Sequence, residues 1–157
     1  MLQRKTITKE KAFQKIKYFC AYQERCHKEV KEKLYSLGLW KRDVEELISQ
    51  LITENYLNEE RFAQQFAGGK FRMKHWGRIK IQYELKQKQV SIYCIKKGLQ
   101  EIKEEEYGKI LRKLAEVKWK TLKSEKSIFT KRRKTMDYLL QKGYERDLAL
   151  EVILNFK

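Results

Sequence analysis

Five cationic side chains are interleaved with two aromatic ones between residues 70 and 80: Lys70, Arg72, Lys74, Arg78 and Lys80, around Phe71 and Trp76. A second run of cations follows later in the chain, at Lys131, Arg132, Arg133 and Lys134. Ammonium and guanidinium groups bind phosphates or carboxylates, and an aromatic side chain beside them either stacks on a base or packs into the core. For the tryptophans Trp40, Trp76 and Trp119 we expect the core. The chemistry predicted for the cationic segments is recognition of an anionic partner.

The expected position of both clusters favours a binding role. Each is predicted at or just before the first helix of a helix pair, where positive charges oppose the helix dipole. We therefore interpret both as contact surfaces for nucleic acid or for an acidic protein groove. Arg25 and Lys28, near the start of the earliest helix pair, join these binding candidates.

Positive charge is spread along the whole chain of 157 residues, which carries 37 Lys and Arg against 21 Asp and Glu, a formal net charge of +16. Residues 1–57 hold 12 basic and 8 acidic side chains, residues 58–103 hold 11 and 4, and residues 104–157 hold 14 and 9. A charge excess of this kind draws a protein toward polyanions. Because it is distributed rather than confined to a tail, it favours a long contact along a polymer.

Catalysis has no local signature in this sequence. It contains no P-loop, no GxGxxG, no nucleophile elbow and no HExxH motif. Acid pairs such as Glu45 and Glu46 fall on amphipathic helices without a convergent partner, so they are interpreted as solvated surface. We expect a binding protein rather than an enzyme, with no cofactor.

The three cysteines, Cys20, Cys26 and Cys94, are an odd number without CxxC spacing. Cys26 and His27 would need two more well-placed ligands to hold zinc, so no metal site is predicted. The sequence shows no apolar signal and no apolar segment of membrane length. A cytoplasmic protein with no membrane partner is expected.

An all-α fold is predicted, because proline is absent and glycine occurs only 7 times. Three segments also align without gaps: 28–51, 79–102 and 133–156. Their apolar positions coincide in four columns: Leu34, Leu85 and Leu139; Val44, Ile95 and Ala149; Ile48, Leu99 and Ile153; Leu51, Ile102 and Phe156. In the middle of the copies stand Gly38, Gln89 and Gly143, each followed by an apolar residue, as at a helix end with a left-handed residue. Each copy is therefore predicted to be a helix, a tight turn and a second helix.

A further helix is expected before each pair, beginning after Thr8, after Asn58 and at Glu104–Glu106. Gly68 and Gly69 are interpreted as a bend or loop. The unit is then three helices, repeated as 1–57 with an N-terminal extension, 58–103 and 104–157. Units of this size bury thin cores, so we expect them to stack into an elongated, curved array.

The run ENYLNEERFAQQF, followed by GRIKIQYELKQKQVSIYCIKKGL, resembles the central motif of the RecX family, regulators of the RecA recombinase. QERCHKEVKEKLYSLG is similar to the first helix pair of the same family, and the repeat covers nearly the whole chain after residue 8. Several residues fall at scaffold positions of the family and are interpreted as mostly structural: Arg25, Leu34, Gly38, Leu57, Phe62, Ala63, Gly77, Arg78 and Leu85. The sequence departs from the family at Gln89, where glycine is usual, and at Cys26, where a helix-capping serine is usual.

The resemblance implies a monomeric cytoplasmic protein that lies along the RecA–DNA filament and inhibits ATP hydrolysis, strand exchange and co-protease activity. It also implies binding to single- and double-stranded DNA, in the context of recombination, DNA repair and the SOS response. The competing reading is a general DNA- or RNA-binding helical repeat protein that acts independently of RecA.

Overall fold

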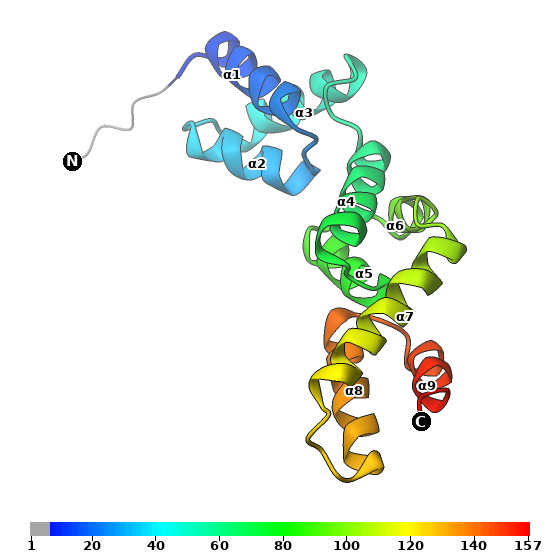
Figure 1. The fold of residues 1–157 in the computed structure, drawn as a ribbon. Coiled ribbons are helices and arrows are strands. Elements are labelled where there is room, and N and C mark those ends of the chain that lie inside the picture. The colour runs from blue at the N-terminus through cyan, green and yellow to red at the C-terminus, as the bar shows by residue number, and fades with distance from the viewer. Residues whose placement is uncertain (1–6) are drawn as a thin grey trace, which may run out of the picture.

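The computed structural model describes residues 7–157 and has nine α-helices and no strand among them. The helices form an elongated, curved array (Figure 1). The all-α prediction is confirmed, while the extension at residues 1–6 lies outside the described residues. In chain order the helices are α1 (Lys9–Tyr22), α2 (His27–Ser36), α3 (Lys41–Thr53), α4 (Glu59–Lys74), α5 (Arg78–Gln87), α6 (Ile92–Leu99), α7 (Glu104–Thr121), α8 (Ile128–Lys142) and α9 (Arg146–Leu154).

The helices pack in three successive triplets. The extensive helix–helix contacts all lie within α1–α3, within α4–α6 or within α7–α9. The triplets follow one another along the array from the N-terminal end to the C-terminal end (Figure 1). The predicted three-helix repeat is therefore present in the fold.

The aligned apolar columns form the cores of the triplets. Leu34, Leu85 and Leu139 are each 0% exposed. The residues that follow the tight turns are buried as well, at 7% for Leu39, 6% for Val90 and 0% for Tyr144. The helical period of these residues thus places apolar side chains on the inner face of each triplet.

Polar side chains fix several of the helix starts. The oxygens of Thr8, Asn58 and Ser91 accept hydrogen bonds from backbone amides three residues later, at 3.2, 2.9 and 3.2 Å. Each bond satisfies an amide that the helix itself leaves without a partner. Glu59, Glu60 and Glu104–Glu106 occupy first turns, where the helix dipole favours negative charge.

The three predicted turn positions share one backbone conformation. Gly38 has φ 93°, Gln89 has φ 61° and Gly143 has φ 99°. Glycine adopts this left-handed region without penalty, whereas a residue with a Cβ is strained there. Gln89 therefore carries strain that the other two turns avoid.

The bend predicted at Gly68 and Gly69 is wrong. Both residues lie inside α4, and the chain turns at His75, whose left-handed φ of 56° ends that helix. Glycine lowers helix propensity by only about 1 kcal/mol relative to alanine, a cost that tertiary packing overrides. Here the packing comes from the buried face of α4, which includes Ala63, Ala67 and Phe71.

Two hydrophobic cores support the three triplets. The first triplet has its own core, whereas the second and third share one continuous cluster. At their junction, the aromatic rings of Phe71 and Tyr107 lie 5.8 Å apart and those of Tyr107 and Tyr144 lie 5.1 Å apart. The second and third triplets are thus one packed body, to which the first is joined.

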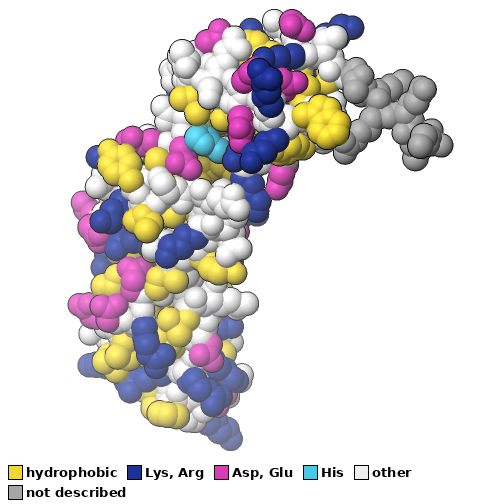
Figure 2. Space-filling model, turned by 180° about the vertical axis from the view of Figure 1, so that it is seen from behind, with side chains coloured by type: hydrophobic (Ala, Val, Ile, Leu, Met, Phe, Trp, Pro, Cys, Tyr) yellow, Lys and Arg dark blue, Asp and Glu magenta, His cyan; other side chains and the backbone are white. Residues whose placement is uncertain are grey.

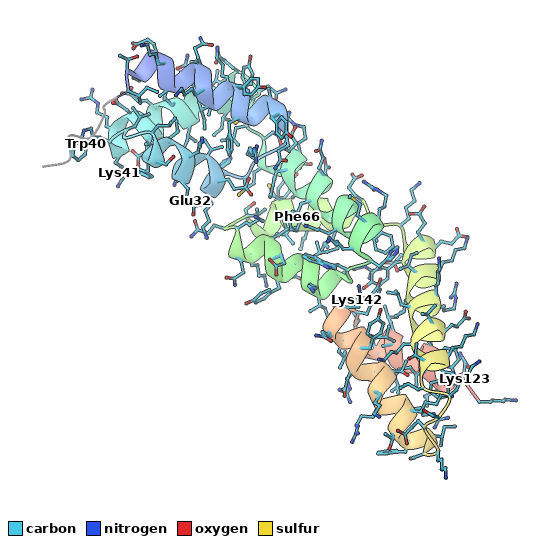
Figure 3. The ribbon with its side chains drawn as sticks, turned by 60° about the vertical axis from the view of Figure 1, so that its left-hand side comes forward. Glu32, Trp40, Lys41, Phe66, Lys123 and Lys142 are labelled. Atoms are coloured by element: carbon cyan, nitrogen blue, oxygen red, sulfur yellow. The ribbon has the colours of Figure 1, made fainter. Side chains whose placement is uncertain are left out.

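Backbone hydrogen bonds join α8 end to end with α5. The amides of Gly77 and Ile79 donate to the carbonyls of Lys142 and Gly143, at 2.8 and 2.9 Å. The amides at the start of one helix thereby satisfy the carbonyls at the end of another, with the two dipoles aligned head to tail. Figure 3 shows Lys142 at this junction, between the α8 and α5 ribbons.

The end-to-end contact leaves no room for a side chain at residue 77. A Cβ on Gly77 would lie 2.2 Å from the carbonyl oxygen of Gly143. A Cβ on Gly143 would lie 2.3 Å from the Cβ atom of Lys80. The junction therefore requires glycine at both positions.

We expect Gln89→Gly to stabilise the protein by about 1 kcal/mol, because removal of the left-handed strain exceeds the added entropy of the unfolded chain. The measurement is urea unfolding followed by circular dichroism. Gln87→Gly is the matched control, since residue 87 is the last residue of α5, and it should lower stability. A lower unfolding free energy for Gln89→Gly than for wild type would contradict the expectation.

Gly77→Ala should destabilise the protein by about 2 kcal/mol or more, because the new methyl group forces the joined helix ends apart. The φ of residue 77 is −76°, so backbone strain contributes nothing to the loss. Gly69→Ala is the control: nothing lies within 4 Å of its added Cβ, and alanine should raise stability by about 1 kcal/mol. Equal melting temperatures for the two variants would refute the steric argument.

Candidate binding interface

The first cationic cluster lies mainly at the end of a helix rather than at the start of one. Lys70, Arg72 and Lys74 belong to the last turns of α4, where the helix dipole stabilises positive charge. The expected opposition to the dipole is therefore wrong for these three residues, because the helix continues through Gly68 and Gly69. Arg72 and Lys74 are exposed.

Lys70 and Lys80 flank the indole ring of Trp76. Their ammonium nitrogens lie 5.0 and 4.6 Å from the centre of the ring. Trp76 itself packs edge-on against Phe66 and is partly buried on the core of the second triplet. This arrangement brings one cation from α4 and one from α5 close to the same aromatic ring.

Arg78 is held by two carboxylates. Its guanidinium nitrogens lie 3.2 Å from Glu145 and 2.7 Å from Glu104, and the group covers the ring of Tyr107 at 3.9 Å. The Tyr107 hydroxyl accepts a hydrogen bond from the Arg78 amide at 3.1 Å and donates one to Glu145 at 2.5 Å. Burial is the main cause that raises the pKa of Tyr107, so its hydroxyl keeps its proton at neutral pH. Arg78 thus links the starts of α5, α7 and α9.

The second cationic cluster divides between two surroundings. The Lys131 ammonium lies over the ring of Trp119 at 4.2 Å, and Lys134 pairs with Glu125 at 3.2 Å. Arg132 and Arg133 instead line a groove between α8 and α9. All four belong to the first half of α8, so of the two clusters this one follows the predicted position at a helix start.

The groove between α8 and α9 combines arginines with exposed apolar side chains. Phe129, Leu150 and Leu154 line it and are 77%, 44% and 55% exposed. The Nε atom of Arg132 is buried without a hydrogen-bond partner. A partner with both carboxylate and apolar groups would complement such a surface. Sequence analysis did not identify the apolar residues of this groove, because only the packing of α9 brings them beside the arginines.

Arg25 and Lys28 make contacts within the fold. The Arg25 guanidinium stacks on the Phe19 ring at 3.7 Å, and its Nε donates to the Phe19 carbonyl at 3.0 Å. Lys28 donates to the carbonyl of Gln87 at 3.3 Å. Arg25 thus ties α1 to the segment before α2, and Lys28 ties α2 to the end of α5.

The remaining tryptophans differ in exposure. Trp119 is buried at 9% and stacks on Phe156 at 5.1 Å, which confirms the core prediction for that residue. For Trp40 the prediction is wrong, because its side chain is 70% exposed. Figure 3 shows Trp40 at the outer end of the first triplet. It precedes α3 as the N-cap residue, a position outside the helical stripe that faces the core.

Lys and Arg side chains lie along the whole length of the face seen in Figure 2, among fewer acidic side chains. The clusters singled out from the sequence are thus parts of a broad basic surface. Such a surface attracts polyanions along its length rather than at a single point.

Among residues 7–157, no group of three or more His, Cys, Asp and Glu side chains could hold a metal ion. None of the described helices is long and apolar enough to cross a membrane. Cys20, Cys26 and Cys94 are free and buried, and burial raises the pKa of the Cys20 thiol to about 11. A protonated, buried thiol is a poor nucleophile, so Cys20 packs as an apolar side chain.

The chain matches two RecX family models: the second three-helix domain over residues 58–99 and the third three-helix domain over residues 104–153. Among similar proteins, the regulatory protein RecX of Clostridium perfringens strain 13 is 32% identical over 130 residues, which are 82% of this chain and 60% of that protein. RecX of Bacillus cytotoxicus is 27% identical over 139 residues, 88% of this chain and 51% of that protein. This chain therefore spans 60% or less of the length of these two relatives.

The fold is also similar to solved structures. The crystal structure of RecX from Lactobacillus salivarius has a TM-score of 0.84 at 24% identity, covering 93% of this chain and 94% of that one. A second crystal structure, of regulatory protein RecX, has a TM-score of 0.84 at 19% identity and covers 94% of this chain and 72% of that one. The likeness of both structures to this chain is one of fold.

Arg78→Ala should lower the unfolding free energy by about 1 to 3 kcal/mol, because it leaves Glu145 without its cationic partner. Thermal unfolding followed by circular dichroism measures the effect. Arg72→Ala removes the same charge from an exposed position on α4 and should change stability by no more than about 0.5 kcal/mol. Equal stability of the two variants would show that the Arg78 network contributes nothing.

Proposed function

This chain belongs to the RecX family of regulatory proteins, and we propose that it regulates a RecA recombinase by lying along the RecA–DNA filament. The observation that carries the proposal is the elongated array of three triplets with positive charge along its length. An array of this shape presents a continuous surface to a polymer, and a long basic surface suits a filament that contains DNA. Inhibition follows if the bound array hinders the movements of neighbouring RecA protomers during ATP turnover, strand exchange and co-protease activity.

The exposed cations of α4 and α5 are proposed to contact phosphate. Arg72 and Lys74 are exposed, while the ammonium groups of Lys70 and Lys80 lie 5.0 and 4.6 Å from the centre of the Trp76 ring. Arg78 is a weaker candidate, because it forms ion pairs with two carboxylates of the same chain. We therefore propose phosphate contacts for Lys70, Arg72, Lys74 and Lys80, and a structural role for Arg78.

The groove between α8 and α9 is proposed to contact RecA itself. Arg132 and Arg133 supply charge there, and Phe129 and Leu150 supply apolar surface. Phosphate contacts alone do not require exposed leucine, whereas protein interfaces combine apolar and arginine side chains. Lys131 and Lys134 lie outside this groove and add to the basic field around it.

We propose further that the chain acts as a monomer in the cytoplasm, with functional domains at 1–57, 58–103 and 104–157. The helix triplets support this division, and the packed body formed by the second and third triplets implies that these two act together. Binding to single- and double-stranded DNA belongs to the same proposal.

A second candidate is a DNA- or RNA-binding repeat protein that acts without RecA. The breadth of the basic surface favours it, because nonspecific polyanion binding needs no other feature. The two candidates differ in their dependence on RecA, which an enzyme assay separates.

We expect the chain to inhibit the single-stranded-DNA-dependent ATPase of RecA at amounts well below those of RecA, at fixed salt and saturating DNA. The double variant Arg72→Ala/Lys74→Ala should inhibit less, because its contact with phosphate is weaker. The control Lys86→Ala/Lys96→Ala removes two exposed charges outside both clusters and should inhibit as wild type does.

Two results would contradict the RecA assignment. One is an absence of inhibition while DNA binding is intact. The other is equal inhibition of an unrelated DNA-dependent ATPase, relieved by extra DNA, which would favour the second candidate.

A further inference from the structure

A groove outside both cationic clusters lies between α1 and α2 in the first triplet. It has a volume of about 550 Å³. Its aromatic lining comes from Tyr18, Phe19 and Tyr22 on α1, and its cationic lining from Lys15, Arg25 and Lys33. The fold thus collects three aromatic rings and three cations in one open depression.

Tyr18 and Tyr22 are unusually exposed to solvent for aromatic side chains. Each is 76% exposed, and the two stand four residues apart, on one face of α1. The opposite face of the helix carries Ala12 and Ile16, which are 0% exposed. The two tyrosines therefore add nothing to the core and present their rings to solvent.

The charges around these rings all have one sign. Lys15 precedes Tyr18 by one helical turn, and Lys33 reaches over from α2, with its ammonium 5.7 Å from the Phe19 ring. The central carbon of the Arg25 guanidinium lies 3.7 Å from the centre of that ring. Within residues 7–157, no acidic side chain lines the groove, so its field selects an anionic ligand.

We propose that this groove binds single-stranded nucleic acid, with unpaired bases stacked on Tyr18 and Tyr22 and phosphates paired with Lys15 and Lys33. Any base can stack on an aromatic ring, and neighbouring cations bind the phosphate backbone of the nucleic acid. A duplex offers no free base face, so its binding would use the lysines alone. The role of this site at a DNA filament rests on the proposed function. The binding of single-stranded nucleic acid itself requires no RecA.

The composition of the lining favours nucleic acid over a protein ligand. In the part of the chain that the structure describes, Leu37 is the only aliphatic residue that lines the groove. The α8–α9 groove, by contrast, is lined by Leu150, Ile153 and Leu154 beside its arginines. Aliphatic side chains pack against protein partners, whereas aromatic rings with lysines match stacked bases and phosphates.

The test measures the affinity of the full chain for a fluorescein-labelled fifteen-residue oligothymidine by anisotropy, without RecA and at fixed salt. Tyr18→Ala/Tyr22→Ala should weaken binding by about tenfold or more, because each lost stack contributes roughly 1 to 3 kcal/mol. Tyr18→Phe/Tyr22→Phe keeps both rings and should bind nearly as wild type does. Affinity for a duplex of the same length should stay nearly constant in both variants.

A matched control is available in the second triplet. Tyr83 and Tyr93 are 60% and 61% exposed, so Tyr83→Ala/Tyr93→Ala removes two open rings elsewhere and should leave the affinity unchanged. Oligonucleotides that carry 5-iodouracil should crosslink to Tyr18 or Tyr22 under ultraviolet light, as mass spectrometry of the peptides would reveal.

Three outcomes would overturn the proposal: undiminished oligothymidine binding by Tyr18→Ala/Tyr22→Ala, an equal loss in the control, or an equal loss in the phenylalanine variant. Undiminished binding together with loss of RecA inhibition would identify the tyrosines as a protein contact. If wild type binds oligothymidine through the two tyrosines but does not inhibit RecA, the proposal for this groove holds and the proposed function is contradicted.

Discussion

The contact of the end of α8 with the start of α5 fixes how the second and third triplets are arranged. Two backbone hydrogen bonds, from Gly77 and Ile79 to Lys142 and Gly143, join the helix ends. Around them, the Tyr144 hydroxyl donates to the carbonyl of His75 at 2.8 Å. Backbone contacts this close tolerate no Cβ, and they leave little freedom in the angle between the helices. The shared aromatic core and the Arg78 network depend on this approach.

The other junction of the array shows what happens without the two glycines. In the alignment of the repeats, Cys26 takes the place of Gly77, and Gln89 takes the place of Gly143. The end of α5 again meets the start of α2, but side chains make the contact: Lys28 with the Gln87 carbonyl, and Lys88 with Glu29 at 3.1 Å. The first triplet keeps a core of its own, although Cys26 packs in the core of the second and third triplets. The two positions thus hold glycines where helix ends bond through their backbones, and Cys26 and Gln89 where side chains join the helices.

Much of the fold could be predicted from the sequence, because it depends on local chemistry and helical period. The left-handed turns, the caps at Asn58 and Ser91, and the column that contains Leu34 all have signals within a few residues. The continuation of α4 through Gly68 and Gly69 had no such signal, since packing against neighbouring helices decides it. Charge clusters were visible in the sequence, but the pairing of Arg78 with Glu145 joins residues 67 positions apart. Sequence reasoning therefore found the cations and could not tell contact residues from structural ones.

The two kinds of junction differ in how firmly they hold the triplets together. The second and third triplets share one core and present their basic residues and the α8–α9 groove as a rigid unit. The first triplet is attached through polar contacts, such as the pair between Arg61 and Glu24 at 2.5 Å, and through Cys26, which packs in the core of the other two triplets. Ion pairs of partly exposed side chains contribute little stability, so a junction made of them costs less to rearrange than a packed core. The orientation of the first triplet is therefore easier to change than the arrangement of the second and third, and the proposed binding to a filament can make use of this difference.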